Sequence, residues 1–407
     1  MTRRLAGAAL AGLFAGVVAP LPVAPAHATV QCEVGKTHFI NRFSQYLLSP
    51  AFAKSWPLAT GKGVTVAVVD SGVDTDNAHM SGDTVLPGKS FVPGPATQDD
   101  YGHGTAVAGI IAAQRLPSGK SGLIGAAPGA TILPVRVFDQ EKTQDSSGPV
   151  SYPPNTVRLA EGIRWAAGHG ADVINVSLST PPDDPDLPTL KSAVRFAHRQ
   201  DALVVASGGD ASGSSVTQPK YPAASPHVIG VAATNANGVV DNYSVHGADI
   251  DVSAPGQGIM VAYHANGDCL SNQQPYTSWA TPFVSAEAAI LREKYPKESA
   301  DHIAYRIKAS ASRPIQGKRD DDQGWGEIRP YVALTMTLDP HREGPTLPGH
   351  RSAPPPKATA RNVHPLASTT SPLESVQREG LWWGLGALGL AALALILKPL
   401  VEITRRR

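Results

Sequence analysis

Cysteine and charged residues are both scarce in this chain. Only 2 of its 407 residues are cysteine, which excludes a small disulfide-held scaffold and a cysteine-rich zinc or iron–sulfur protein. Charged residues make up 17% of the sequence, below the roughly 25% usual for soluble domains. The 35 basic and 34 acidic residues leave a net charge of +1. This balance gives no electrostatic reason to expect nucleic acid as a partner.

Apolar residues account for 42% of the sequence, and many of them lie near the two ends. Two arginines near the N-terminus precede an apolar run over residues 5–19, and a small-x-small pattern follows at 26–28. These features predict a secretory signal peptide over residues 1–28. The alternative is an uncleaved anchor, which the short run, broken by Pro20 and Pro22, fits less well.

A second apolar stretch covers residues 381–397 and contains no charged residue. Two tryptophans stand at its start, and three arginines end the chain. Aromatic residues favour the membrane interface and basic residues the cytoplasmic side. We therefore predict a transmembrane helix over 380–400 and a cytoplasmic tail over 401–407, which makes this a single-pass cell-membrane protein with its body outside. The alternative is a buried core helix.

Between these ends we predict three further segments. Residues 339–379 are rich in proline, serine, threonine and alanine, a composition typical of an extended linker that does not fold. The body, residues 56–338, is long enough for one large enzyme domain. Residues 29–55 form a short N-terminal extension.

The body alternates apolar runs typical of buried parallel strands with helical patterns. The expected strands are 64–69, 131–137, 171–178, 202–206 and 228–232, and the expected helices are 104–113, 155–168 and 190–199. This alternation predicts an α/β fold with a mostly parallel sheet flanked by helices. In such folds the functional residues gather at the carboxyl ends of the strands.

Three short motifs contain side chains that suit nucleophilic catalysis. Asp70 ends the first strand, His103 lies between two glycines at a helix start, and Ser278 precedes a helical pattern that runs to about residue 295. Taken singly, each has an ordinary structural explanation, as a turn former, a structural histidine and a helix N-cap. Taken together, they follow one known chain order of a Ser-His-Asp triad.

Over about residues 56–307 the chain resembles the subtilisin-like serine proteases, or subtilases. The matching motifs are Asp70-Ser71-Gly72, His103-Gly104-Thr105 and Thr277-Ser278-x-Ala280-x-Pro282. The resemblance implies a doubly wound subtilisin-like fold, serine endopeptidase activity on a protein or peptide, and Asp70, His103 and Ser278 as catalytic residues. It also implies that the substrate adds as a strand along residues 176–179. The substrate-binding residues would then be Ser177, Leu178, Ser179, Ser207, Gly208 and Gly209, with an apolar or small preference.

Two residues depart from the subtilase pattern within the catalytic centre. Asp210 stands where the family has the asparagine of the oxyanion hole. An ionised carboxylate donates no hydrogen bond, although a protonated one can, and the backbone N–H of Ser278 remains as a second donor. Tyr276 replaces a glycine, which implies a changed loop or a strained φ angle. A catalytically impaired pseudoprotease that acts as a structural component is therefore the alternative function.

The order of segments resembles one branch of the subtilases, the mycosins. Mycosins have a signal peptide, a short extension, a catalytic body, a proline-rich linker and one C-terminal anchor, in that order. The resemblance implies association with the membrane components of a type VII secretion system, both as a protease and as a structural part of the complex.

The two cysteines and two acidic loops complete the candidate features. Cys32 and Cys269 are both expected outside the cytoplasm, where disulfides persist, so we predict that they pair; two free thiols are the alternative. Carboxylates cluster at 183–186 and 320–322, where solvated loops are a simpler explanation than calcium sites. We therefore expect no required metal or cofactor, although a structural calcium ion is left open.

Overall fold

The computed structural model describes residues 32–47, 52–117, 119–145, 148–211, 217–271, 273–313, 315 and 317–350. The predicted signal peptide, most of the linker, the predicted transmembrane helix and the tail lie outside these residues. Within the described part of the chain, no helix is both long and apolar enough to cross a membrane.

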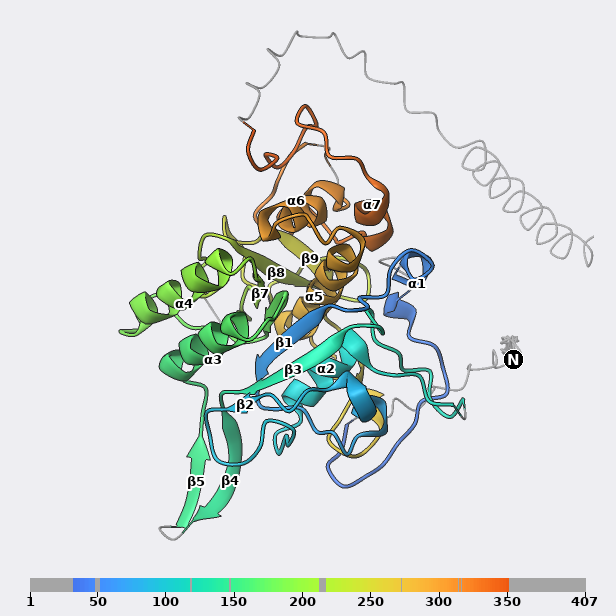
Figure 1. The fold of residues 1–407 in the computed structure, drawn as a ribbon, viewed down its shortest axis with the longest axis vertical. Coiled ribbons are helices and arrows are strands. Elements are labelled where there is room, and N and C mark those ends of the chain that lie inside the picture. Colours follow the sequence, from blue (N-terminus) through green and yellow to red (C-terminus); the bar gives the residue numbers. More distant parts are fainter. Residues whose placement is uncertain are drawn as a thin grey trace, which may run out of the picture. The chain divides into compact units, whose positions relative to one another are not determined.

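A seven-stranded parallel sheet forms the centre of the body (Figure 1). Its strands in spatial order are β2 (Lys89–Ser90), β3 (Thr131–Arg136), β1 (Thr65–Asp70), β6 (Val173–Val176), β7 (Leu203–Ser207), β8 (Val228–Thr234) and β9 (Val252–Pro255). The chain passes from β1 to one side of the sheet and then returns to β6 on the other side. The sheet therefore has a switch point between β1 and β6, which is where ligand sites form in such folds.

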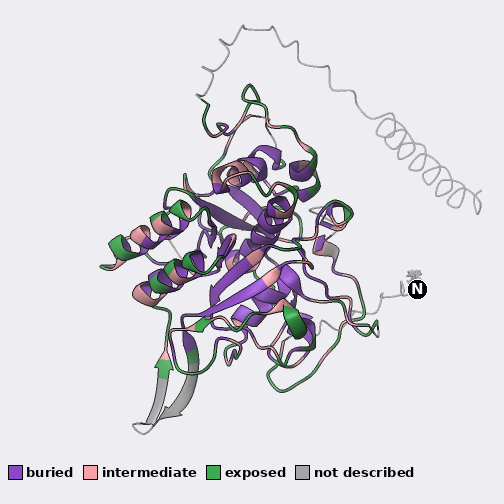
Figure 2. Ribbon diagram, viewed as in Figure 1, coloured by how far each residue is buried: buried purple, intermediate pink, exposed green. Residues whose placement is uncertain are grey.

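Helices cover both faces of the sheet. Alternate residues of β1 point to opposite sides: Val66 and Val68 join one apolar core, and Ala67 and Val69 join the other. The first core includes α2 (His103–Ala112) and α5 (Thr277–Lys294), and the second includes α3 (Thr156–Gly168) and α4 (Leu187–Arg199). Figure 2 shows the central strands of the sheet mostly buried and the outer faces of α3 and α4 exposed.

The remaining elements lie around this framework. They are η1 (Gln45–Leu47), α1 (Phe52–Ser55), η2 (Ala78–Met80), η3 (Gly82–Thr84), the hairpin β4 (Asp139–Asp145) and β5 (Gly148–Tyr152), the hairpin β10 (Met260–Ala262) and β11 (Asp268–Leu270), α6 (Ala300–Ser310) and α7 (Pro330–Thr335). Figure 1 shows the β4–β5 hairpin projecting away from the sheet.

The five predicted strands and the predicted helices are confirmed, with ends that shift by a few residues. The body also continues further than predicted. Leu347 is buried against Tyr305 and Ala309 of α6, and the Tyr305 hydroxyl donates to the carbonyl oxygen of Asp339. The first dozen residues assigned to the linker are thus attached to the body, because they supply an apolar side chain to a small cluster on α6.

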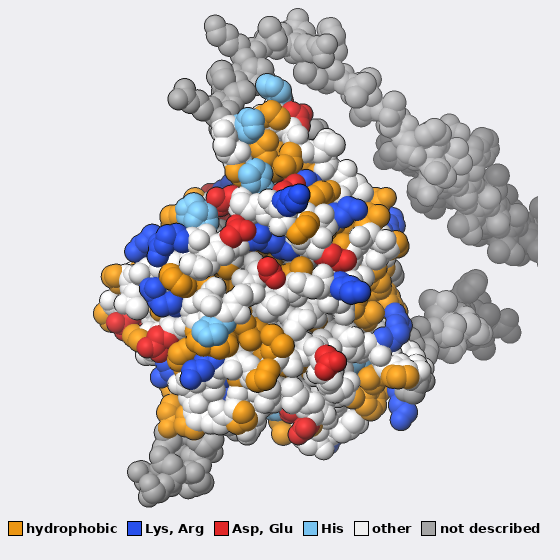
Figure 3. Space-filling model, in the orientation of Figure 1, with side chains coloured by type: hydrophobic (Ala, Val, Ile, Leu, Met, Phe, Trp, Pro, Cys, Tyr) orange, Lys and Arg blue, Asp and Glu red, His pale blue; other side chains and the backbone are white. Residues whose placement is uncertain are grey.

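On the face shown in Figure 3, basic and acidic side chains are interspersed.

Candidate active site

The carboxyl end of β1 places Asp70 beside the first residue of α2. Asp70 is fully buried, and its Oδ1 lies 2.8 Å from Nδ1 of His103. The same oxygen accepts the backbone N–H of Ser71 at 2.8 Å. These contacts hold the imidazole with Nδ1–H directed at the carboxylate, which leaves Nε2 as a proton acceptor.

Glycines allow α2 to begin this close to β1. A Cβ at residue 104 would lie 2.1 Å from the carbonyl oxygen of Gly72, so only glycine fits there. Gly102 has φ +84°, a conformation that favours glycine, and caps the helix. Gly104 thus lets the backbone at Gly72 approach the start of α2.

Asp99 holds this helix start and was not identified from the sequence. Its Oδ1 accepts the N–H of Gly102 at 2.8 Å, and its Oδ2 accepts the N–H and the hydroxyl of Thr105 at 2.8 and 2.6 Å. Burial raises the pKa of Asp99, and the hydrogen bonds from Thr105 and Gly102 oppose that rise. An acidic residue just before a helix is a signal for such a role.

Ser278 is the second residue of α5 and is half-buried. The following residue, Trp279, lies against His103, with ring centroids 4.9 Å apart. Ser278 thus adjoins a residue whose ring packs on the imidazole, and its own hydroxyl makes no hydrogen bond to another described residue. Catalytic hydrogen bonds often form only when substrate is bound. Its position at a helix N-terminus favours developing negative charge nearby.

A chain of buried hydrogen bonds fixes the first turns of α5. Asn175 donates to the Ser177 hydroxyl at 3.0 Å, and that hydroxyl donates to the carbonyl oxygen of Ser278 at 2.9 Å. Ser285 donates to the side-chain oxygen of Asn175 at 2.8 Å. Asn175 was not identified from the sequence, although a polar residue within a buried apolar strand is the signal that marks it.

The six predicted substrate-binding residues divide into two groups. Ser177 and Ser207 are buried, and the Ser207 hydroxyl is hydrogen-bonded to the hydroxyl of Thr277. Both serines thus position α5. Leu178 is half-buried, Ser179 is exposed, and Gly208 and Gly209 are buried, so Leu178 and Ser179 remain the members with surface open to a peptide.

Asp210 lies beside α5, where its Oδ1 accepts the N–H and the hydroxyl of Thr277 at 2.8 and 2.9 Å. The residue as a whole is exposed, but its carboxyl group is partly desolvated. That desolvation raises the pKa of Asp210, while the bonds from Thr277 oppose the rise. The position predicted for the oxyanion hole is therefore occupied by an acceptor that is tied to the helix.

The charge of Asp210 also reaches His103. Burial lowers the pKa of His103, but the charge and hydrogen bond of Asp70, with smaller contributions from the charges of Asp99 and Asp210, raise it above the ordinary 6.5. A histidine with a raised pKa is a stronger base, and it requires a higher pH to be neutral.

Tyr276 caps α5 in an ordinary extended conformation, with φ −82° and ψ 138°. The strained φ angle that its substitution for glycine suggested is therefore absent. Its N–H donates to the carbonyl oxygen of Gly256 at 3.2 Å. The loop therefore accommodates a non-glycine residue at this position without backbone strain.

Cys32 and Cys269 are joined by a disulfide in the structure. Cys32 and His103 both line a cleft of about 310 Å³, together with Trp279. The N-terminal extension is also held by Ile40, whose N–H donates to Oδ1 of the buried Asp268 at 2.7 Å. The extension is thus attached beside His103.

Neither acidic loop has the form of a cation site. Asp184 accepts the hydroxyl of Thr156 and the N–H of Asp186, and Asp320 accepts two backbone N–H groups of its own turn. Asp321 and Asp322 form ion pairs with Arg319 and His246. Among the described residues, the side chains with the spacing of a metal site are His198, His227 and Asp301.

Residues 61–326 match the Subtilase family. Subtilisin BL of Lederbergia lenta is 36% identical over 255 residues, which cover 62% of this chain and 85% of that protein.

Among solved structures, MycP1 of Mycobacterium smegmatis is 25% identical with a TM-score of 0.65, over 81% of this chain and 92% of that one. A serine protease MycP1, described as an essential component of the type VII (ESX-1) secretion system, is 27% identical with a TM-score of 0.63, over 75% and 92%.

The family match covers most of the body and contains all three motif residues in the arrangement described above. The chain belongs to the subtilase family and is a serine endopeptidase of mycosin-like structure.

Proposed function

We propose that this protein is a membrane-anchored, extracytoplasmic serine endopeptidase of the mycosin type that acts within a type VII secretion complex. The observation that carries the enzymatic part is the 2.8 Å contact between Asp70 and His103 beside the N-terminus of the helix that holds Ser278. This arrangement supplies an oriented base next to a hydroxyl nucleophile.

The geometry supports acyl transfer in two steps. His103 Nε2 removes the proton of Ser278 as its hydroxyl oxygen attacks the scissile carbonyl carbon. Asp70 holds Nδ1–H and stabilises the imidazolium, which then protonates the departing amine. Water repeats the sequence on the acyl-enzyme and releases the second product. The N–H of Ser278 and the N-terminal end of α5 stabilise the oxyanion.

The substrate lies along residues 176–179 as an added strand in this proposal. Leu178 and Ser179 follow β6 at the switch point of the sheet, close to the first turn of α5. Backbone hydrogen bonds would bind the peptide independently of its sequence.

Membrane anchorage and secretion are supported by the segment order and by the structural relatives. The apolar stretch at 381–397 has tryptophans at its start and arginines after its end. This pattern fits a single transmembrane helix whose C-terminal end lies in the cytoplasm. A relative that is 27% identical is described as a component of the ESX-1 system. Partner proteins would be the membrane subunits of such a system.

One observation favours the alternative of an impaired protease that acts as a structural part of the complex. Asp210 stands in place of an uncharged donor, and its Oδ1 is engaged by Thr277. Losing one oxyanion donor costs about 10²–10³ in rate. A chain with slow turnover would still fold, and its body could still serve as a structural part of the complex.

Labelling with a fluorophosphonate probe distinguishes these functions, because the probe reacts only with an activated serine. The full chain should be labelled, and Ser278→Ala should not be. Ser192→Ala is the matched control, since Ser192 lies on α4 and contacts Arg164. No labelling of the folded chain, with Ser192→Ala also unlabelled, would support the structural role.

Deletion of residues 380–407 tests the membrane anchor. We expect the shortened protein to be released into the medium.

A further inference from the structure

Three elements meet at the end of the sheet opposite the triad. His198 lies in the last turn of α4, His227 precedes β8, and Asp301 lies in the first turn of α6. His198 Nε2 is 3.0 Å from Asp301 Oδ2, and His227 Nδ1 is 3.3 Å from Asp301 Oδ1. One carboxylate thus faces two imidazoles that are 103 and 74 residues away in sequence.

The two imidazoles are stacked, with centroids 3.6 Å apart and planes 22° from parallel. This stacking places one nitrogen of each ring toward the same carboxylate. One ligand atom from each residue lies within 4.8 Å of the other two. His227 also has φ +66°, a conformation that costs a non-glycine residue energy and is tolerated where the surroundings fix it.

The two histidine–aspartate separations, 3.0 and 3.3 Å, are close to those around a tetrahedral metal ion. With metal–nitrogen distances near 2.0–2.1 Å, neighbouring ligand atoms are about 3.3 Å apart. Two imidazoles and one carboxylate are a donor set that favours zinc and similar transition metals, whereas calcium and magnesium favour oxygen ligands alone. We propose that His198, His227 and Asp301 bind one divalent transition-metal ion, with zinc as the expected metal.

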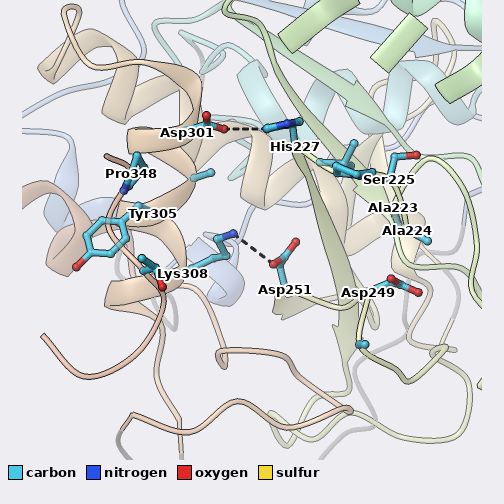
Figure 4. Close-up of a pocket in the computed structure, with 15 residues that line it drawn as sticks. Ala223, Ala224, Ser225, His227, Asp249, Asp251, Asp301, Tyr305, Lys308 and Pro348 are labelled. Carbon is cyan, nitrogen blue, oxygen red and sulfur yellow. Dashed lines mark hydrogen bonds and ion pairs between the residues drawn. The ribbon is translucent and has the colours of Figure 1, made fainter. Parts of the chain in front are cut away.

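The site opens onto a pocket that leaves room for the fourth ligand. His227 and Asp301 line a cavity of about 550 Å³ together with Asp249, Asp251 and Lys308 (Figure 4). Lys308 is paired with Asp251 at 3.5 Å, so the carboxylates of Asp249 and Asp301 leave the lining with excess negative charge. A cation is attracted by this pocket, and a water molecule can complete its coordination.

A metal ion here would join helix α4, strand β8 and helix α6 at one point. It would stabilise the folded chain by mass action, because the unfolded chain does not hold the three residues together. The ion would be structural, since the catalytic residues lie at the carboxyl ends of the strands, at the other end of the sheet.

Zinc binding to the purified full chain tests the site. After treatment with a chelator, we expect one zinc ion per chain to bind by calorimetry and the melting temperature to rise. His227→Gln and Asp301→Asn should each lose at least about tenfold in affinity, because even outer-shell changes cost 10–100-fold. His246→Gln is the matched control, since His246 pairs with Asp322 alone at 2.7 Å, and it should bind zinc as the natural chain does.

Three results would overturn the proposal. They are no zinc binding by the natural chain, equal affinity in His227→Gln and the natural chain, and loss of binding in His246→Gln to the same extent. Binding at Asp70 and His103 would survive His227→Gln and so would be distinguished from the proposed site. Circular dichroism of each variant establishes that it is folded, and His198→Gln replaces any variant that is not.

Discussion

Asp210 Oδ1 accepts two hydrogen bonds from Thr277, the residue directly before Ser278 in the first turn of α5. The carboxylate therefore holds the helix that contains Ser278, and it does so with one of its two oxygens. An asparagine can make the same two bonds through its side-chain oxygen and still have an N–H₂ group to donate. This relationship makes the position testable without loss of its structural contacts.

We expect Asp210→Asn to increase kcat/KM for a peptide substrate by about tenfold or more, with the 10²–10³ attributed to one oxyanion donor as the upper range. The new amide adds a donor where negative charge develops and removes a repelling carboxylate. Hydrolysis of a chromogenic peptide measures the change. Asp172→Asn is the control, because Asp172 likewise accepts a backbone N–H, from Thr65 at the far end of β1. An unchanged or lower rate in Asp210→Asn would show that position 210 does not contribute to the oxyanion hole.

The same substitution should shift the pH dependence of activity. The acid limb of kcat/KM reports the loss of neutral His103 in the free enzyme. Burial lowers the pKa of His103, but the charges of Asp70, Asp99 and Asp210 raise it above 6.5, so the limb should lie above that pH. Removing the charge at Asp210 destabilises the imidazolium and lowers the pKa of His103. The limb should then move to lower pH, and a shift to higher pH would contradict this assignment.

Strand and helix positions in the body followed from sequence patterns because periodic burial determines them. The continuous apolar run that includes Val66, Val68 and Val69 can only be buried on both faces, and the structure places these residues in the two cores. Short or polar elements such as β2 and the β4–β5 hairpin carry no such pattern. Their positions depend on tertiary contacts that the local sequence does not reveal.

In the candidate site, too, the local sequence does not reveal roles that depend on tertiary contacts. Asp70, His103 and Ser278 are recognisable because Asp70 ends a strand and the other two lie in the first turns of helices, each within a short motif. The roles of Ser177 and Ser207 could not be predicted, since facing a substrate or bracing α5 uses the same residue type. His198, His227 and Asp301 are far apart in sequence, so no local spacing indicates that they meet.

The disulfide should stabilise the chain and hold the cleft in place. Its cysteines are 237 residues apart, and closing a loop of that length is worth nominally about 5 kcal/mol through the unfolded state. We expect the double variant Cys32→Ser, Cys269→Ser to unfold at lower denaturant concentration. Because Cys32 lines the cleft with His103, KM should also rise. Unchanged stability would show that the hydrogen bonds of Asp268 and Ile40 suffice to attach the extension.

Glu287 should make stability depend on pH. It is fully buried in α5, and neither of its oxygens has a hydrogen-bond partner among the described residues. Burial raises its pKa well above the ordinary 4.5, so the folded chain holds a proton that the unfolded chain releases once the pH exceeds about 4.5. The free energy of unfolding therefore falls as the pH rises from that value towards the folded-state pKa.

Glu287→Gln removes this titration while keeping the side-chain shape. We expect the variant to match the natural chain near pH 4.5 and to be more stable at pH 8, as measured by urea unfolding at both values. Glu161→Gln is the matched control, because Glu161 lies exposed on α3 and its substitution should leave the pH dependence unchanged. If the advantage of Glu287→Gln is the same at both pH values, folding does not raise the pKa of Glu287, and a polar partner must stabilise its charge.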